Sequence, residues 1–160
     1  MFKKYILIFL ISMVPVIELR GAIPFAVGWD LNIPLSYLLC IVGNILPVPF
    51  IILFGKFILE KLSQVKKIGP FFKKIIDRAD RKAHELGKAE FWGIYIFVAI
   101  PLPGTGAWTG SLIAAILRMR LKKAFLAIAL GVLTSGVIML VASIAVKAGI
   151  LTGLDFLTGM

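Results

Sequence analysis

Apolar residues fill most of the chain, and two of the apolar segments are each interrupted near the middle by a short polar stretch. The first segment, residues 5–29, is broken at residues 15–21 (PVIELRG), and the second, residues 91–117, at residues 101–106 (PLPGTG). About ten residues of helix, at 1.5 Å per residue, reach half way across a hydrocarbon core about 30 Å thick. Because lipid does not tolerate bare backbone polar groups, we expect both breaks to be buried in protein or to line a hydrated cavity near the midplane.

Two other apolar runs lack such a polar break. Residues 34–59 and 121–146 are each long enough to cross a bilayer with some tilt. Pro34 fits the first turn of a helix, where a missing N–H costs nothing, whereas Pro47 and Pro49 are expected to kink the helix that contains them. The pattern predicts two full crossings.

The two halves of the chain show a weak internal symmetry. When Pro103 is aligned with Pro15, Gly131 falls on Gly43. If each interrupted segment enters and leaves the membrane on one side, each half has an odd number of crossings, and the second half is inverted relative to the first.

The predicted fold is therefore an all-α integral membrane protein with two re-entrant helical hairpins and two full transmembrane helices in an inverted repeat. We expect one domain over residues 1–160, with half-repeats at residues 1–59 and 91–160 and a linker at residues 60–90. In a rival topology residues 5–29 cross fully, which moves the N-terminus to the other side of the membrane.

Composition supports the membrane class. The chain is 60% hydrophobic and 16% charged, whereas charged residues make up about a quarter of a soluble domain. It has one cysteine, Cys40, and one histidine, His84, so the sequence offers no cluster with metal-ligand spacing, and we expect no metal and no cofactor. The residue constellations of intramembrane proteases are also missing, so we do not expect an enzyme.

The net charge of +10 is concentrated beside the apolar segments. Basic residues cluster at residues 61–88 and 118–123, which is the positive-inside pattern of cytoplasmic loops and argues against a nucleic-acid partner. We predict a multi-pass protein of the cell (plasma) membrane with its central basic loop in the cytoplasm. The linker is amphipathic, and two interpretations stay open: a solvated helix packed on the protein, or a helix in the headgroup layer attracted to anionic lipid.

A few polar residues fall at the same depth as the breaks. Glu18 and Arg20 would be costly at the midplane unless paired or hydrated, and a contact between them requires unwound backbone. Residues 104–106 are expected to open a half-helix whose free N–H groups attract anions. A structural role for these residues and a role in substrate or proton movement both stay open. The candidate substrate- or proton-binding residues are Glu18, Arg20, Asn44, Gly104, Thr105, Gly106, Trp108, Thr109 and Ser135.

Residues 15–24 (PVIELRGAIP) and 101–110 (PLPGTGAWTG) resemble the two signature motifs of the small multi-drug export protein family. That family is in turn similar to the DedA, or SNARE-associated, membrane proteins. The resemblance covers nearly the whole chain and implies two opposed re-entrant hairpins and a role in transport. In the DedA relatives the second motif carries arginines around its proline, and these relatives are implicated in moving polyprenyl-phosphate lipid carriers. This chain has no arginine there, so neutralising a phosphate would fall to Arg20 and backbone amides.

Two functions follow from these observations. The first is a transporter or lipid translocase that moves a small amphipathic or lipid-linked substrate through a midplane site between the hairpins, with proton coupling through Glu18 as an option. The second is a non-transporting scaffold or assembly factor that binds anionic lipid or a partner through the basic central helix. Because four short segments bury little surface, we also expect a homodimer.

Overall fold

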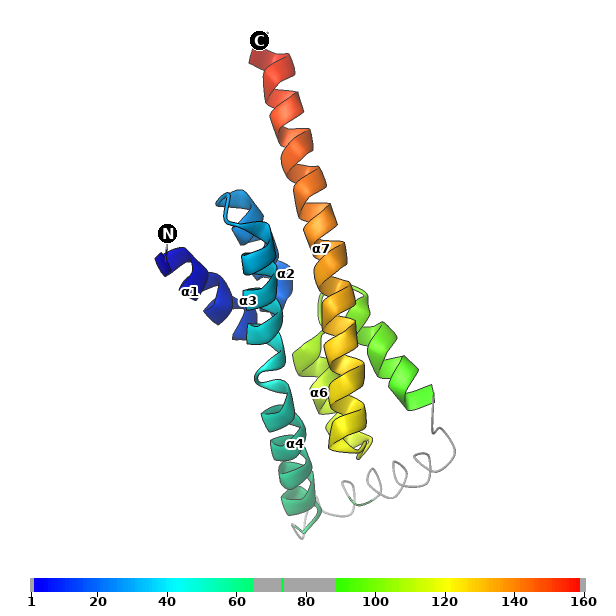
Figure 1. The fold of residues 1–160 in the computed structure, drawn as a ribbon. Helices are drawn as coiled ribbons and strands as arrows, with labels where there is room; N and C mark the ends of the chain where they lie inside the picture. Colours follow the sequence, from blue (N-terminus) through cyan, green and yellow to red (C-terminus); the bar gives the residue numbers. More distant parts are fainter. Residues whose placement is uncertain (1, 65–72, 74–88, 159–160) are drawn as a thin grey trace.

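The structure, a computed structural model, describes residues 2–64, 73 and 89–158 (Figure 1). All regular secondary structure in this part of the chain is helical, which confirms the predicted all-α class. The helices are α1 (Phe2–Met13), α2 (Glu18–Gly28), α3 (Ile33–Ile45), α4 (Val48–Ser63), an unlabelled helix Ala89–Ala99, α6 (Ala107–Ile116) and α7 (Leu121–Thr158). The predicted central helix lies mostly outside the described residues.

Both apolar segments are interrupted, but the first break is shorter than predicted: it spans residues 14–17, and Glu18–Gly21, expected in the break, lie in α2. The second break, residues 100–106, agrees closely with the predicted residues 101–106. The chain leaves α1 after Met13 and re-enters a helix at Glu18, and it leaves the helix Ala89–Ala99 before α6 begins at Ala107. Pro15 lies in the first interruption and Pro101 and Pro103 in the second, and proline lacks the N–H that continues a helix. The left-handed residue is Val16 in the first interruption and Gly104 in the second, where glycine adopts this conformation without strain.

The first interrupted segment forms a hairpin. The backbone N–H of Asn32, just beyond α2, donates to the hydroxyl of Tyr5 in α1 at 3.1 Å. The Lys4 ammonium lies 5.7 Å from the ring centroid of Trp29. The chain therefore returns after the break to the end at which it started, and α2 runs back alongside α1 (Figure 1).

Two longer helical stretches accompany the hairpins and run in opposite directions (Figure 1). Ile33–Ile58 has 26 residues and Leu121–Gly149 has 29, and both are long and apolar enough to cross a membrane. The side chain of Asn32 caps α3 by accepting from the N–H of Leu35 at 3.1 Å, and Pro34 lies in the first turn, as predicted. The predicted kink lies at Leu46 and Pro47, between α3 and α4. Helix α7 continues to Thr158, beyond the predicted end at residue 146.

The return helices α2 and α6 end in the same kind of turn. After α2, the N–H of Leu31 donates to the carbonyl of Ala26 at 3.1 Å, and Asp30 has φ of 53°. After α6, Met119 donates to Ala114 at 3.0 Å, and Arg118 has φ of 52°. Both are Schellman turns, in which a left-handed residue lets the chain satisfy the last helical carbonyls.

The return helices exchange partners between the two halves of the chain. Helix α2, from the first half, contacts α7, and α6, from the second half, contacts α4. Small residues allow close packing: a β-carbon on Gly110 or on Gly131 would lie 2.6 or 2.7 Å from the side chain of Val98. The helix Ala89–Ala99 and α6 form the second hairpin (Figure 1). The buried core runs between the helices, and hydrogen bonds join the tips of the two hairpins at Glu18 and Trp108.

Candidate functional site

Glu18 joins the two breaks. It is the first residue of α2, it is 5% exposed, and its φ of 51° is in the left-handed region that few residues other than glycine adopt. Its carboxylate accepts hydrogen bonds from two backbone N–H groups at the start of α6, from Ala107 at 3.3 Å and from Trp108 at 3.0 Å. A negative charge here stabilises the positive end of α6, so one hairpin caps the helix of the other.

The α6 cap leaves no room for a side chain at Gly106. This buried glycine is the N-cap position of α6, and it supplies no side-chain cap of its own. A β-carbon on Gly106 would lie 2.2 Å from Oε2 of Glu18. The carboxylate can approach the helix end because residue 106 is glycine.

Arg20 binds the other side of the second break. Its guanidinium donates from Nη1 to the carbonyl of Leu102 and from Nη2 to the carbonyl of Ile100 at 3.3 Å. The hydroxyl of Thr105 lies 2.8 and 2.9 Å from the same two carbonyl oxygens. These carbonyls follow the carboxyl end of the helix Ala89–Ala99, the negative end of its dipole, where a cation is favourable. Each also accepts from a backbone N–H of the break, Ile100 from Leu102 and Leu102 from Thr105.

Glu18 and Arg20 do not pair with each other, although such a pair was one of the two ways to lower their cost at the midplane. Within the described residues no ion pair joins them, and each charge instead binds backbone groups of the opposite hairpin. The physical reason is that both residues lie in α2, and residues two apart on a helix point to different faces. The positive end of α6, which the sequence analysis left free for an anionic ligand, is occupied by Glu18.

Trp108 adds a third link between the hairpins. Its indole Nε1–H donates to the carbonyl of Met13 at 3.1 Å, so the last residue of α1 is tied to the first turn of α6. This hydrogen bond could not be predicted from the spacing of residues, because Met13 and Trp108 belong to segments far apart in the chain.

A pocket of about 190 Å³ opens at this junction. Its lining consists of Pro15, Val16, Glu18, Arg20, Gly104, Thr105, Trp108, Thr109 and Leu112. Six of the nine candidate residues therefore surround one space, and Gly106 borders it through its contact with Glu18. Sequence reasoning missed Pro15, Val16 and Leu112 as lining residues.

A family model described as "Putative small multi-drug export protein" matches residues 18–138. The chain belongs to this family. The match runs from Glu18 into α7 and includes the whole second break. Neither the curated proteins nor the solved structures contain a match to the chain. Membership of this export family, together with the two long apolar helices, identifies a membrane protein.

Two of the candidate residues lie away from the pocket. Asn44 in α3 is fully buried and Ser135 in α7 is 2% exposed, and neither lines the junction pocket. Their side-chain polar atoms have no hydrogen-bond partner within the described residues. In the part of the chain that the structure describes, no three acidic, histidine or cysteine side chains group as a metal site.

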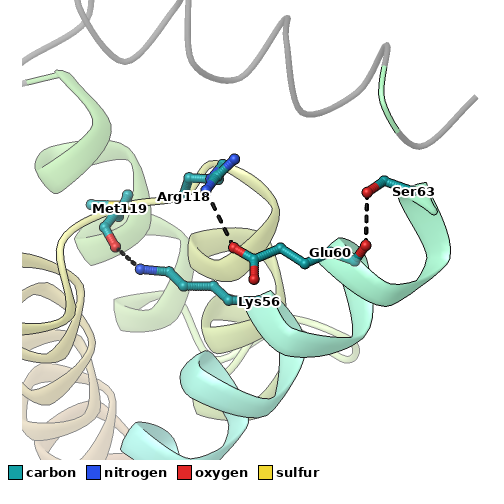
Figure 2. Close-up of polar contacts among 5 residues, drawn as sticks. All are labelled: Lys56, Glu60, Ser63, Arg118 and Met119. Atoms are coloured by element: carbon teal, nitrogen blue, oxygen red, sulfur yellow. Dashed lines mark hydrogen bonds and ion pairs between the residues drawn. The ribbon is translucent and has the colours of Figure 1, made fainter. Parts of the chain in front are cut away.

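At the carboxyl ends of α2 and α6, a lysine from another helix donates to a backbone carbonyl of the turn that follows or ends the helix. Figure 2 shows Lys56 of α4 donating to the carbonyl of Met119 at 2.5 Å, while Arg118 lies 3.3 Å from the carboxylate of Glu60. At the opposite end of the molecule, Lys147 of α7 donates to the carbonyl of Val27 at 3.0 Å.

Lys147 also forms an ion pair with Asp30, the left-handed residue of the turn after α2. Each lysine thus comes from the half of the chain that does not contain the turn it binds. Lys147 was not predicted as a site residue, because its partners, the carbonyl of Val27 and the carboxylate of Asp30, are distant along the chain.

Proposed function

We propose that this protein is a small membrane transporter or lipid translocase, and that its substrate, a small amphipathic or lipid-linked molecule, passes through the pocket at the junction of the two hairpin tips. The observation that carries the proposal is the position of Glu18 and Arg20 in that pocket, enclosed by the ends of broken apolar helices. Charged residues inside membrane segments are costly and are retained where substrates, ions or protons move. The export function in the family description supports the same conclusion.

The transport proposal includes a topology of two re-entrant hairpins in an inverted repeat, in the plasma membrane and with the central basic loop in the cytoplasm. The return of the chain from Asn32 to Tyr5 supports re-entry of the first hairpin. Equivalent positions of the two halves also share unusual backbone angles: Val16 and Gly104 have φ of 79° and 82°, and Asp30 and Arg118 have 53° and 52°. Inverted repeats with broken helices at the midplane are a common transporter design.

The junction pocket is small for a substrate site, so the transport proposal requires the hairpin tips to move. Sites for small organic ligands are typically about 300–1,000 Å³. The junction pocket, at about 190 Å³, is smaller than this range. We infer that the described arrangement is a closed state, and that the tips separate when a substrate occupies the site.

The separation of the tips depends on the charge of the Glu18 carboxylate, because this carboxylate holds the start of α6. A proton or a cationic group that neutralises its carboxylate weakens the attraction to the N–H groups of Ala107 and Trp108. The cap on α6 then loosens and the tips part. Arg20 and Thr105 hold the other side of the break and limit how far the second hairpin is released.

The test is a flux assay with the purified full-length chain in liposomes, using ethidium as an amphipathic cation and a fluorescent sulfonate as an amphipathic anion. We expect the protein to carry one of the two dyes, and we expect the flux of that dye to depend on an imposed pH gradient. Glu18→Gln is expected to remove that dependence, and Thr109→Phe, which fills the pocket, is expected to lower flux at every pH. Glu60→Gln is the matched control, because it removes a carboxylate outside the pocket.

Two results would count against the transport proposal. If Glu18→Gln leaves the pH dependence unchanged, Glu18 does not carry the proton. If Thr109→Phe leaves flux unchanged, the junction pocket is not the path. A scaffold that acts through the basic central loop instead predicts that charge reversal at residues 66–74 abolishes function in cells while the variants of Glu18 only alter stability.

A further inference from the structure

A second pocket, of about 500 Å³, lies between α2 and α7. Its lining is Pro24, Val27 and Gly28 from α2, and Met139, Ala142, Ser143, Val146 and Lys147 from α7. Most of these side chains are apolar, and the volume lies within the usual range of about 300–1,000 Å³ for ligand sites. We name this space the α2–α7 groove.

The groove has a direction relative to the membrane. Its lining on α7 begins at Met139 and ends at Lys147, a rise of about 12 Å along a helix. Lys147 lies two residues before the end of the apolar stretch Leu121–Gly149. The lysine end of the groove is thus at the depth of lipid headgroups, and the Met139 end is at the depth of acyl chains.

An acid and a base lie together at the headgroup end. Lys147 forms its ion pair with Asp30, whose side chain is 82% exposed, while that of Lys147 is 32% exposed. An ammonium group has three donors. Within the described residues, Lys147 uses two of them, on Asp30 and on the carbonyl of Val27. One donor of Lys147 and an exposed carboxylate oxygen of Asp30 can therefore receive a ligand.

We propose that the α2–α7 groove binds a zwitterionic phospholipid whose headgroup carries a primary amine, that is, phosphatidylethanolamine. The phosphate binds the ammonium of Lys147, the amine of the headgroup donates to Asp30, and an acyl chain lies along the groove toward Met139. Charge-assisted hydrogen bonds of this kind are stronger than neutral ones. An anionic headgroup without an amine would meet Asp30 with a repelling charge, and a choline headgroup has no N–H to donate.

This inference rests on the membrane location of the protein and not on transport, so it is tested without a flux measurement. The full-length chain is delipidated in mild detergent and offered equal amounts of phosphatidylethanolamine, phosphatidylcholine and phosphatidylglycerol, and the retained lipid is counted by native mass spectrometry. We expect phosphatidylethanolamine to be retained several-fold more than either of the others. Asp30→Asn is expected to abolish the preference over phosphatidylcholine, and Lys147→Gln to reduce retention of all three lipids.

A steric pair of variants tests the position of the bound lipid. A β-carbon on Gly28 or on Gly149 meets no atom within 4 Å, but Gly28 lines the groove and Gly149 does not. Gly28→Leu is expected to reduce lipid retention several-fold, while Gly149→Leu leaves it unchanged. Equal retention of the three lipids, or normal retention by Gly28→Leu, would overturn the proposal. So would a dimer in detergent that Gly28→Leu dissociates, because a second copy of the chain would then be the occupant.

Discussion

The carboxylate of Glu18 occupies the space that a β-carbon on Gly106 would need. The distance from that β-carbon to Oε2 of Glu18 would be 2.2 Å, well inside van der Waals contact. The two residues belong to different hairpins, and their fit lets a buried carboxylate reach the N–H groups that open α6. The size of one residue therefore controls how closely the two breaks approach.

Gly106→Ala is expected to displace Glu18 and destabilise the protein. Inserting a methyl group into a packed site costs about 1–3 kcal/mol. Thermal unfolding in detergent, followed by tryptophan fluorescence, measures the loss. Gly93→Ala is the control, because a β-carbon there meets no atom within 4 Å.

A double-mutant cycle tests the cause of the loss at residue 106. If the clash with Glu18 is responsible, the combined variant Glu18→Ala/Gly106→Ala is expected to be no less stable than Glu18→Ala alone. Additive losses would place the clash elsewhere.

Arg20→Lys is expected to weaken the second break although the charge is kept. A guanidinium reaches two acceptors through a rigid fork, here the carbonyls of Ile100 and Leu102, whereas an ammonium acts as a point charge. The loss of one hydrogen bond corresponds to about 0.5–1.5 kcal/mol. The unfolding temperature of Arg20→Lys is compared with that of Arg120→Lys, at an exposed arginine outside the pocket. Equal stability of the two variants would contradict the bidentate role.

Val16→Gly is expected to stabilise the chain. Val16 is a β-branched residue with φ of 79°, a conformation that costs about 1–3 kcal/mol for such a residue. Glycine removes this strain but loses about 0.5–1 kcal/mol of backbone entropy, so we expect a net gain of about 1 kcal/mol.

The reverse substitution at the equivalent position isolates the strain of the backbone. Gly104 has φ of 82° and open space at its β-carbon, so Gly104→Val is expected to be destabilising through conformation alone. Thermal unfolding of both variants gives the comparison. A loss of stability in Val16→Gly would show that the valine side chain contributes packing at the pocket instead.

Water at the hairpin tips is tested by cysteine labelling. In a Cys40→Ala background, single cysteines at Val16 and Thr109 are treated with a membrane-impermeant maleimide in liposomes. Both positions line the junction pocket, and Val16 is 93% exposed. We expect labelling at both positions, and substrate is expected to slow it at Thr109. A cysteine at Leu126, an exposed apolar position on α7 outside that pocket, is expected to stay unlabelled.

The sequence was sufficient to locate the two breaks, because proline and glycine act locally on the backbone. Local signals also identified the first turn of α3 at Pro34 and the kink at Pro47, whereas the cap at Asn32 was not predicted. Glu18 and Arg20 were predicted as site residues from the sequence because charged side chains inside an apolar segment are costly.

The partners of those charges could not be read from the sequence. Glu18 and Arg20 bind the backbone of residues eighty or more positions away, and backbone donors and acceptors are present at almost every residue, so the sequence does not distinguish these partners. A pair between the two side chains was one of the alternatives that the sequence left open, but the helical backbone from Glu18 onward separates them. The contribution of Lys147 was missed because the turn it binds lies in the other half of the chain.

The exchange of partners between the return helices has a consequence for biogenesis. Because α2 lies against α7, the first hairpin has no complete docking surface until the final helix has left the ribosome. Until α7 is made, the face of α2 that contacts α7 is covered only by lipid or by a chaperone. Assembly of the molecule is then a late, all-or-none step, and truncation within α7 is expected to leave α2 without its partner.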